Sequence, residues 1–234
     1  MTFEIGGRGL FGKTVCLSFA ALSFVAWIYV ACAEAQAAPA GDAFDAYIDE
    51  LRRDYPDVYA QRRALSAQAD SMTGEELGRR LSEVTAPALA KARALTPDDL
   101  AMRIVRLEVD EYRQALARDP NLCWGLARGG VPQGALDQAT ADQELRNKTE
   151  QLRYAATHVE APGPRATSEE IKSISHVLTQ DHRDDAMVVA DILSTGGPPS
   201  DLEDAKAFCR WQLAFFGEVL NRGPEFAGRF VRSI

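Results

Sequence analysis

The sequence predicts an all-α protein, an irregular bundle of about seven helices behind an N-terminal signal or anchor segment. Three observations support this fold class. Alanine supplies 37 of the 234 residues, and Leu, Arg, Glu and Gln, which are also strong helix formers, fill most of the rest. No window alternates apolar and polar residues with the period of a strand. Capping boxes recur, as in Thr73-Gly-Glu-Glu76 and Thr167-Ser-Glu-Glu170, and each marks the start of a helix.

The first half of the chain predicts helices over 42–54, 57–69, 74–94 and 97–118. Pro56 separates the first two, and Thr96-Pro97-Asp98-Asp99 gives the last one a cap, a proline and two acids at its start. We expect the helix over 97–118 at the centre of the bundle, because a helix that is apolar on two sides packs between neighbours. Its two apolar stripes are Leu100, Ile104 and Leu107, and Val105, Val109, Tyr112 and Leu116.

The second half predicts a turn-rich stretch over 121–133, a helix over 134–158 and a loop over 160–166. Two short helices follow, over 168–179 and 183–194. The last long helix covers 201–221, with Ser200-Asp-Leu-Glu203 as its capping box and a short terminal turn behind it. At this length one domain, residues 38–234, is the default. The apolar residues near the C-terminus belong either to the core or to a docking surface for a partner: Phe226, Phe230, Val231 and Ile234.

A charge-free apolar run over residues 14–32 predicts export. Two cations precede it and small residues follow it, a pattern typical of a secretory signal. We expect residues 1–37 to be the signal, cut between Ala37 and Ala38, and the body to lie in the periplasm or outside the cell. The alternative is an uncleaved inner-membrane anchor with a periplasmic domain, because the run approaches the ~20 residues that span a bilayer.

Residues Gly7 to Thr14 match the P-loop pattern G-x-x-x-x-G-K-[ST], which binds phosphate groups. A P-loop needs a buried strand before it and an amphipathic helix after it. Here only Thr2 to Ile5 precede the motif, and the apolar run follows it. Nucleotide binding is therefore a minor alternative.

Two of the four cysteines, Cys123 and Cys209, lie outside the export segment. An even pair in an oxidising compartment predicts a disulfide. The helical period directs Cys209 toward the core, together with Leu213 and Phe216. Two buried free thiols are the alternative.

Candidate catalytic and metal-binding residues are few. Asp181-His182-Arg183-Asp184-Asp185, with His176 nearby, offers imidazole and carboxylate groups, but it also fits a helix start that Asp181 caps. Glu111 falls on an apolar stripe, so we expect partial burial and a perturbed pKa. An ion pair with Arg103 or Arg118 is the simpler expectation for this carboxylate.

These observations favour a non-enzymatic accessory or binding module of the cell envelope, which recognises another envelope or secreted protein through a helix-lined groove. This hypothesis also predicts an exposed apolar patch with a polar border. The alternative is a cell-wall-directed hydrolase that uses Glu111 and a second carboxylate. No cofactor is expected. The net charge of −8 argues against nucleic acid as a partner, and contact with a membrane is expected only through residues 14–32 if they stay uncleaved.

Overall fold

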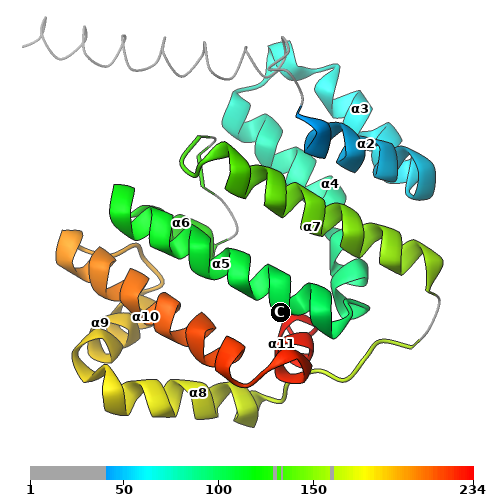
Figure 1. Ribbon diagram of the computed structural model, residues 1–234. Helices are drawn as coiled ribbons and strands as arrows, with labels where there is room; N and C mark the ends of the chain where they lie inside the picture. Colours follow the sequence, from blue (N-terminus) through cyan, green and yellow to red (C-terminus); the bar gives the residue numbers. More distant parts are fainter. Residues whose placement is uncertain (1–40, 129–130, 133, 159–160) are drawn as a thin grey trace, which may run out of the picture. The chain divides into compact units, whose positions relative to one another are not determined.

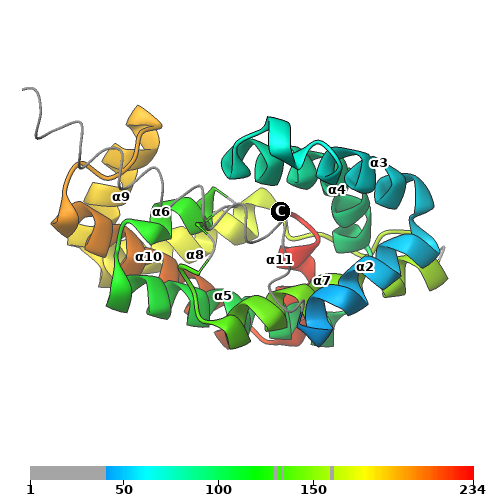
Figure 2. The same ribbon diagram turned by 90° about the horizontal axis from the view of Figure 1, so that it is seen from above.

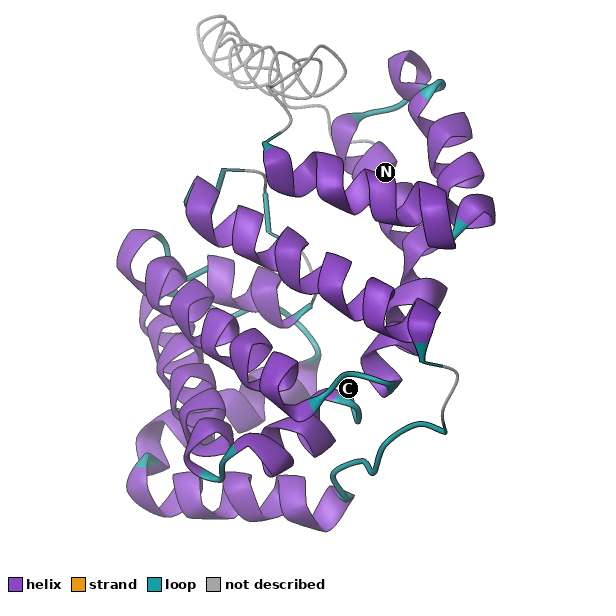
Figure 3. Cartoon of the chain, turned by 45° about the vertical axis from the view of Figure 1, so that its right-hand side comes forward, coloured by secondary structure: helices purple, strands orange, loops and turns teal. Residues whose placement is uncertain are grey.

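The computed structural model describes residues 41–128, 131–132, 134–158 and 161–234. Over these residues the chain forms ten α-helices, one short 3-10 helix and no strand, which confirms the all-α prediction. Figure 3 shows the helices and the loops that join them. No helix in the described ranges is both long and apolar enough to cross a bilayer. The expected signal over 1–37, its cut between Ala37 and Ala38, the apolar run and the P-loop match all lie outside the described residues.

Most helices follow the predicted ranges, and Figure 1 shows their arrangement. The chain order is α2 (Asp42–Asp54), α3 (Pro56–Ser66), η1 (Ala69–Ser71), α4 (Gly74–Ala94), α5 (Asp98–Arg118), α6 (Leu122–Ala127), α7 (Gln138–Thr157), α8 (Ser168–Asp181), α9 (Arg183–Thr195), α10 (Leu202–Asn221) and α11 (Pro224–Val231). The number of helices was underestimated. The stretch over 121–133 contains α6, and the expected terminal turn is the eight-residue helix α11.

The helix starts are partly as predicted. Thr167 and Glu170 form the reciprocal capping box of α8. The predicted caps of α5 and α10 are wrong. Asp201, not Ser200, accepts the backbone N–H groups at the start of α10. The hydroxyl of Thr96 donates to the carbonyl oxygen of Ala92 and accepts from Gln151, so it is used in a tertiary contact instead of a cap.

The described chain divides into two compact units, residues 60–85 and residues 41–59 with 86–234. In the smaller unit, Arg62 donates hydrogen bonds to the Leu81 carbonyl oxygen (3.1 Å) and the Thr85 hydroxyl (2.9 Å). These bonds join its two helical segments. A single exported domain over 38–234 stays a prediction.

Helix α5 lies at the centre of the larger unit, between α10 and α11 on one side and α7 on the other (Figure 1). This confirms the position predicted from its two apolar stripes. Val105, Tyr112 and Ala115 of α5 are buried in a first apolar cluster with residues from α6 and α8 to α11. Figure 2 shows α11 packed beside α5, and three of the C-terminal residues prove to be core: Phe226, Phe230 and Val231. Ile234 is exposed.

A second apolar cluster joins α2, α4 and α7, with Tyr47, Leu51 and Leu152 among its buried members. It shares no residue with the first cluster. Polar contacts connect the two regions across α5 and α7. Gln114 donates to Thr140 at one end of this contact (2.7 Å), and Gln151 donates to Thr96 at the other end (2.9 Å). The two helices are therefore antiparallel, with a polar seam between them.

Cys123 of α6 and Cys209 of α10 form a disulfide, with 5.5 Å between their Cα atoms. Their separation of 86 residues means that the bridge closes a long loop. A helix of six residues has little stability of its own. The covalent link to α10 and the burial of Cys123 therefore account for a helix where the local sequence indicates turns.

Replacing both cysteines by serine is expected to lower the free energy of unfolding by about 2–5 kcal/mol, because the unfolded chain loses a long-range restraint. Urea unfolding of the oxidised protein and the double variant measures the difference. As the control, a reducing agent should destabilise the wild type and leave the variant unchanged. Alkylation of Cys123 and Cys209 in the wild type without prior reduction would contradict the bridge.

Candidate functional site

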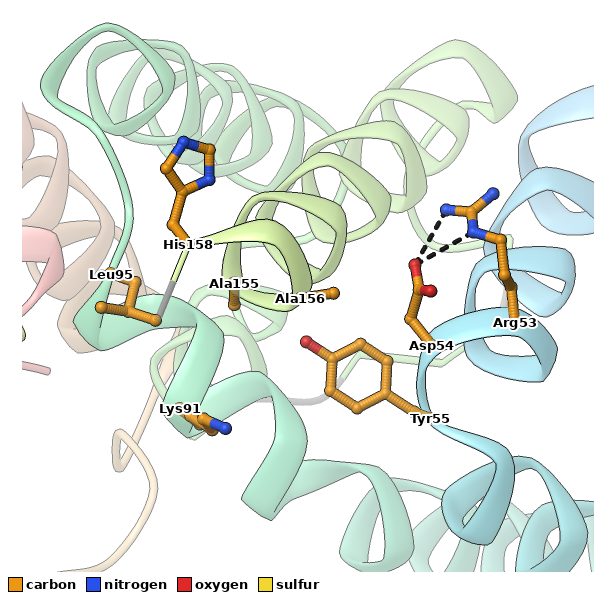
Figure 4. Close-up of a pocket in the computed structure, with 8 residues that line it drawn as sticks. All are labelled: Arg53, Asp54, Tyr55, Lys91, Leu95, Ala155, Ala156 and His158. Atoms are coloured by element: carbon orange, nitrogen blue, oxygen red, sulfur yellow. Dashed lines mark hydrogen bonds and ion pairs between the residues drawn. The ribbon is translucent and has the colours of Figure 1, made fainter. Parts of the chain in front are cut away.

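A pocket of about 410 Å³ lies within the larger unit where α2, α4 and α7 end (Figure 4). Its volume falls in the range of small-ligand sites. Its lining combines apolar and charged side chains. The lining residues are Arg53, Asp54, Tyr55, Lys91, Leu95, Ala155, Ala156 and His158.

The charged residues of the pocket divide into one pair and one lone cation. Arg53 donates two hydrogen bonds of 3.0 Å to the Asp54 carboxylate, and this pairing holds the pKa of Asp54 below its usual range. Lys91, on the opposite side in Figure 4, forms no ion pair with any residue that the structure describes. The pocket therefore presents a positive charge to a ligand.

Two further polar side chains of the pocket, Tyr55 and His158, are hydrogen-bonded to backbone carbonyl oxygens of the protein. Burial raises the pKa of Tyr55, and its hydroxyl donates to the Leu152 carbonyl oxygen (2.9 Å). The His158 ring stacks on Tyr154 with 3.8 Å between centroids, and its Nδ1 lies 2.9 Å from the Tyr154 carbonyl oxygen. The Thr157 hydroxyl lies 3.0 Å from the same ring nitrogen, so Nδ1 is engaged with protein atoms on two sides.

The buried carboxylate of Glu50 supports Arg53, one of the residues that line the pocket. Glu50 is 1% exposed, and it accepts a hydrogen bond from Arg53 at 2.6 Å and from Arg153 of α7 at 3.0 Å. A buried charge is costly unless it is paired. The bond from Arg53 lies within α2, and the bond from Arg153 joins α2 to α7. Glu50 thus holds Arg53 in the position from which it pairs with Asp54.

Glu111, the carboxylate singled out by the sequence, is buried on α5 with 6% of its surface exposed. Burial raises its pKa to about 8, and the charges of Glu108 and Glu144 add to this shift. The predicted perturbation is therefore confirmed. The predicted arginine partners are wrong, because Arg103 pairs with Glu150 and Arg118 donates to the Ala135 carbonyl oxygen. Arg103 joins α5 to α7, and Arg118 joins α5 to the segment that precedes α7.

The structure also adds a second carboxylate that the sequence did not single out. Glu108 lies one turn before Glu111, and burial raises its pKa to about 7. The spacing of three residues places both on one side of α5. Glu108 is part of the polar seam, which could be located only once α7 was known to lie opposite it.

The residues over 181–185 form a helix junction. His182 separates α8 from α9, and Asp185 forms an ion pair with Arg210 of α10. Asp181 is the last residue of α8 and does not cap α9, so that prediction is wrong. Among the described residues, no three His, Cys, Asp or Glu side chains gather in a way that could hold a metal ion.

Comparisons of the chain with protein-family models, with curated proteins and with solved structures found no match. The fold and the side chains described above therefore carry the functional argument. None of the residues His158, Lys91, Tyr55 and Glu50 was singled out from the sequence. These residues come from three separate helices, and no spacing along the chain connects them.

Replacing Glu50 by alanine is expected to lower the free energy of unfolding by about 2 kcal/mol, because two charge-assisted hydrogen bonds and buried packing are lost. The control is Asp49→Ala. Asp49 pairs with Arg52 on the surface of the same helix, where both side chains are more than half exposed, so its loss should cost below about 0.5 kcal/mol. Chemical denaturation of both variants measures the contrast, and equal losses would mean that Glu50 does not lock α2 to α7.

Proposed function

We propose that the chain is an exported, non-enzymatic binding protein that recognises an acidic group of another envelope or secreted protein in the pocket formed by α2, α4 and α7. The single observation that carries the proposal is the charge arrangement of this pocket. Arg53 and Asp54 neutralise each other, so the ammonium group of Lys91 remains to attract a carboxylate. Tyr55, Leu95 and two alanines offer apolar contact to the atoms that carry it.

Two side chains of the pocket favour binding over catalysis. Asp54 and Tyr55 are both engaged with protein atoms, as fixed recognition surfaces require. A general base must instead be free to take a proton from a substrate.

Export rests on the signal pattern over residues 1–37, and the disulfide fits an oxidising compartment. The periplasm or the cell exterior is the proposed location, with an inner-membrane anchor as the alternative.

Exposed apolar residues contribute less to the proposal. The most exposed are Met187 and Leu193 on α9, and others stand on α2, α8 and α10. Single exposed apolar side chains are ordinary in soluble proteins. An apolar patch with a polar border stays a prediction, and the pocket is the stronger indication.

A photo-crosslinking amino acid at position 156, in the pocket wall, is expected to give a discrete adduct in cells. Ala156 is exposed, so the substitution is tolerated, and Ala190 of α9 is an equally exposed control position. Lys91→Glu should abolish the adduct because it reverses the free charge, and Lys91→Arg should keep it. The protein is recovered from periplasmic and membrane fractions, and its intact mass shows whether it begins at Ala38.

An adduct that Lys91→Glu leaves unchanged would overturn recognition of an acidic group. No adduct at position 156, or the same adduct at position 190, would overturn the pocket as the binding site. A membrane-bound species that still carries residues 1–37 would replace the cleaved signal by an anchor.

The second candidate function is a cell-wall-directed hydrolase. Burial keeps Glu111 protonated near neutral pH, as a general acid must be, and Glu108 supplies another carboxylate one turn away. Against it, Glu111 lies in the seam between α5 and α7 and is not among the residues of the pocket.

Incubation with purified peptidoglycan is expected to release no soluble fragments, since we propose binding and not turnover. Glu111→Gln and Asp110→Asn are compared with the wild type. Asp110 is an exposed acid on the same helix, paired with Arg113. Release that Glu111→Gln abolishes and Asp110→Asn retains would establish the hydrolase in place of the binding protein.

A further inference from the structure

Two polar side chains of the pocket formed by α2, α4 and α7 can accept a hydrogen bond from a ligand but have none to donate. Tyr55 uses the single hydrogen of its hydroxyl on the Leu152 carbonyl oxygen (2.9 Å), so its oxygen can only accept. Asp54 is ionised at neutral pH, because its pairing with Arg53 lowers its pKa, and a carboxylate has no hydrogen to donate. A ligand atom that bonds to either group must therefore supply the hydrogen.

The pairing with Arg53 leaves part of the Asp54 carboxylate unused. Both hydrogen bonds from Arg53 end on Oδ2, as the two dashed lines in Figure 4 show. The neighbouring Glu50 carboxylate accepts from Arg53 and Arg153 and has no hydrogen to offer the other oxygen, Oδ1. No nitrogen of a described residue donates to Oδ1 either. Since the Asp54 side chain keeps 24% of its surface exposed and lines the pocket beside Tyr55, Oδ1 is free to accept from a ligand.

Three helix ends add negative potential to the same region. Helix α2 ends at Asp54, α4 at Ala94 and α7 at Thr157, and residues at or next to all three ends line the pocket. The last carbonyl groups of an α-helix have no partner within the helix and carry a partial negative charge. This potential favours a cationic donor over a neutral one near Asp54.

Lys91 gives the other side of the pocket the opposite character. Its ammonium group can only donate, and it forms no ion pair within the described part of the chain. In Figure 4 it lies across Tyr55 from Asp54. The pocket thus has a donor at Lys91 and acceptors at Asp54 and Tyr55. A ligand that satisfies both sides carries a carboxylate and an ammonium group on one small unit.

We propose that the pocket binds the amino-terminal end of a partner chain that begins with an acidic residue. The side-chain carboxylate of that residue lies against Lys91, and its α-ammonium group donates to Oδ1 of Asp54 and to the hydroxyl oxygen of Tyr55. An amino-terminal Asp or Glu is the smallest unit of a protein that carries both charges. This inference rests on the proposed function and adds the ammonium group to it.

The setting of the pocket suits the end of a chain. Arg53, Lys91 and Ala156 are exposed lining residues, so the pocket is open to solvent. A chain that enters by its first residue can therefore continue outward past them. Exported partners gain a new free amino terminus when their own signal is removed, so such ends occur in the proposed compartment.

Four short peptides test the inference against the oxidised full-length protein by fluorescence anisotropy. Two begin with Asp and two with Asn, one of each pair is acetylated at its amino terminus, and all carry a dye on an amidated carboxyl end. The free-amine Asp peptide should bind about tenfold more tightly than its acetylated form, because acetylation removes a charge-assisted hydrogen bond. Free aspartate, added as a competitor, distinguishes a chain end from a free amino acid.

Asp54→Asn should remove most of the preference for the free amino terminus, because a neutral amide replaces the charged acceptor. The matched control is Asp57→Asn, which changes an exposed acid at the start of α3 outside the pocket and should retain the preference. If Asp54→Asn does not fold, Tyr55→Phe keeps the ring, removes the other acceptor and tests the same side of the pocket.

Equal binding of the free and acetylated Asp peptides, or no binding of any peptide, would overturn the inference. A preference that both Asp54→Asn and Tyr55→Phe retain would do the same. Displacement by free aspartate as effective as displacement by the unlabelled peptide would overturn the chain end in favour of an amino acid. The proposed function is judged separately, because it requires that Asp peptides bind more tightly than Asn peptides and that position 156 gives an adduct.

Discussion

The burial of α5 on two sides is the constraint on which the larger unit depends. One side of the helix lies in the apolar cluster formed with α6 and α8 to α11, and the other meets α7. Exposed residues such as Arg106, Asp110 and Arg113 recur along the helix, whereas polar residues on its two buried sides must be satisfied by neighbouring helices or remain unpaired. Gln114, bonded to Thr140, is an example of the first outcome, and Glu111 is an example of the second.

This constraint explains why the most perturbed carboxyl groups occur on α5 instead of in the pocket. In the pocket, Asp54 is accessible and paired with an arginine, and its pKa is lowered. In the seam, Glu111 is 6% exposed and forms no ion pair with any residue in the described ranges, and burial raises its pKa. The same kind of group is thus shifted in opposite directions, by an ion pair in the pocket and by burial on α5.

Local signals predicted much of the helical framework. Pro56 separates α2 from α3, Thr167 and Glu170 cap α8, and the two stripes of α5 predicted its central position, because each signal acts within one or two turns of the chain. The same reasoning failed where a residue is taken by a distant segment. Thr96 contacts Gln151 instead of capping α5, and Arg103 pairs with Glu150 instead of Glu111.

The sequence by itself determined the all-α class, the position of most helices, the cysteine pair and the unusual setting of Glu111. The tertiary structure alone decided that α6 is a helix, that Phe226, Phe230 and Val231 are core, and that Lys91 and His158 share a pocket. The physical reason is the separation along the chain over which each kind of interaction acts. Capping and periodicity depend on neighbours a few residues apart. Burial, ion pairing and pocket formation depend instead on which helices lie side by side. Different packings of the same helices satisfy the same local rules, so those rules do not select one packing.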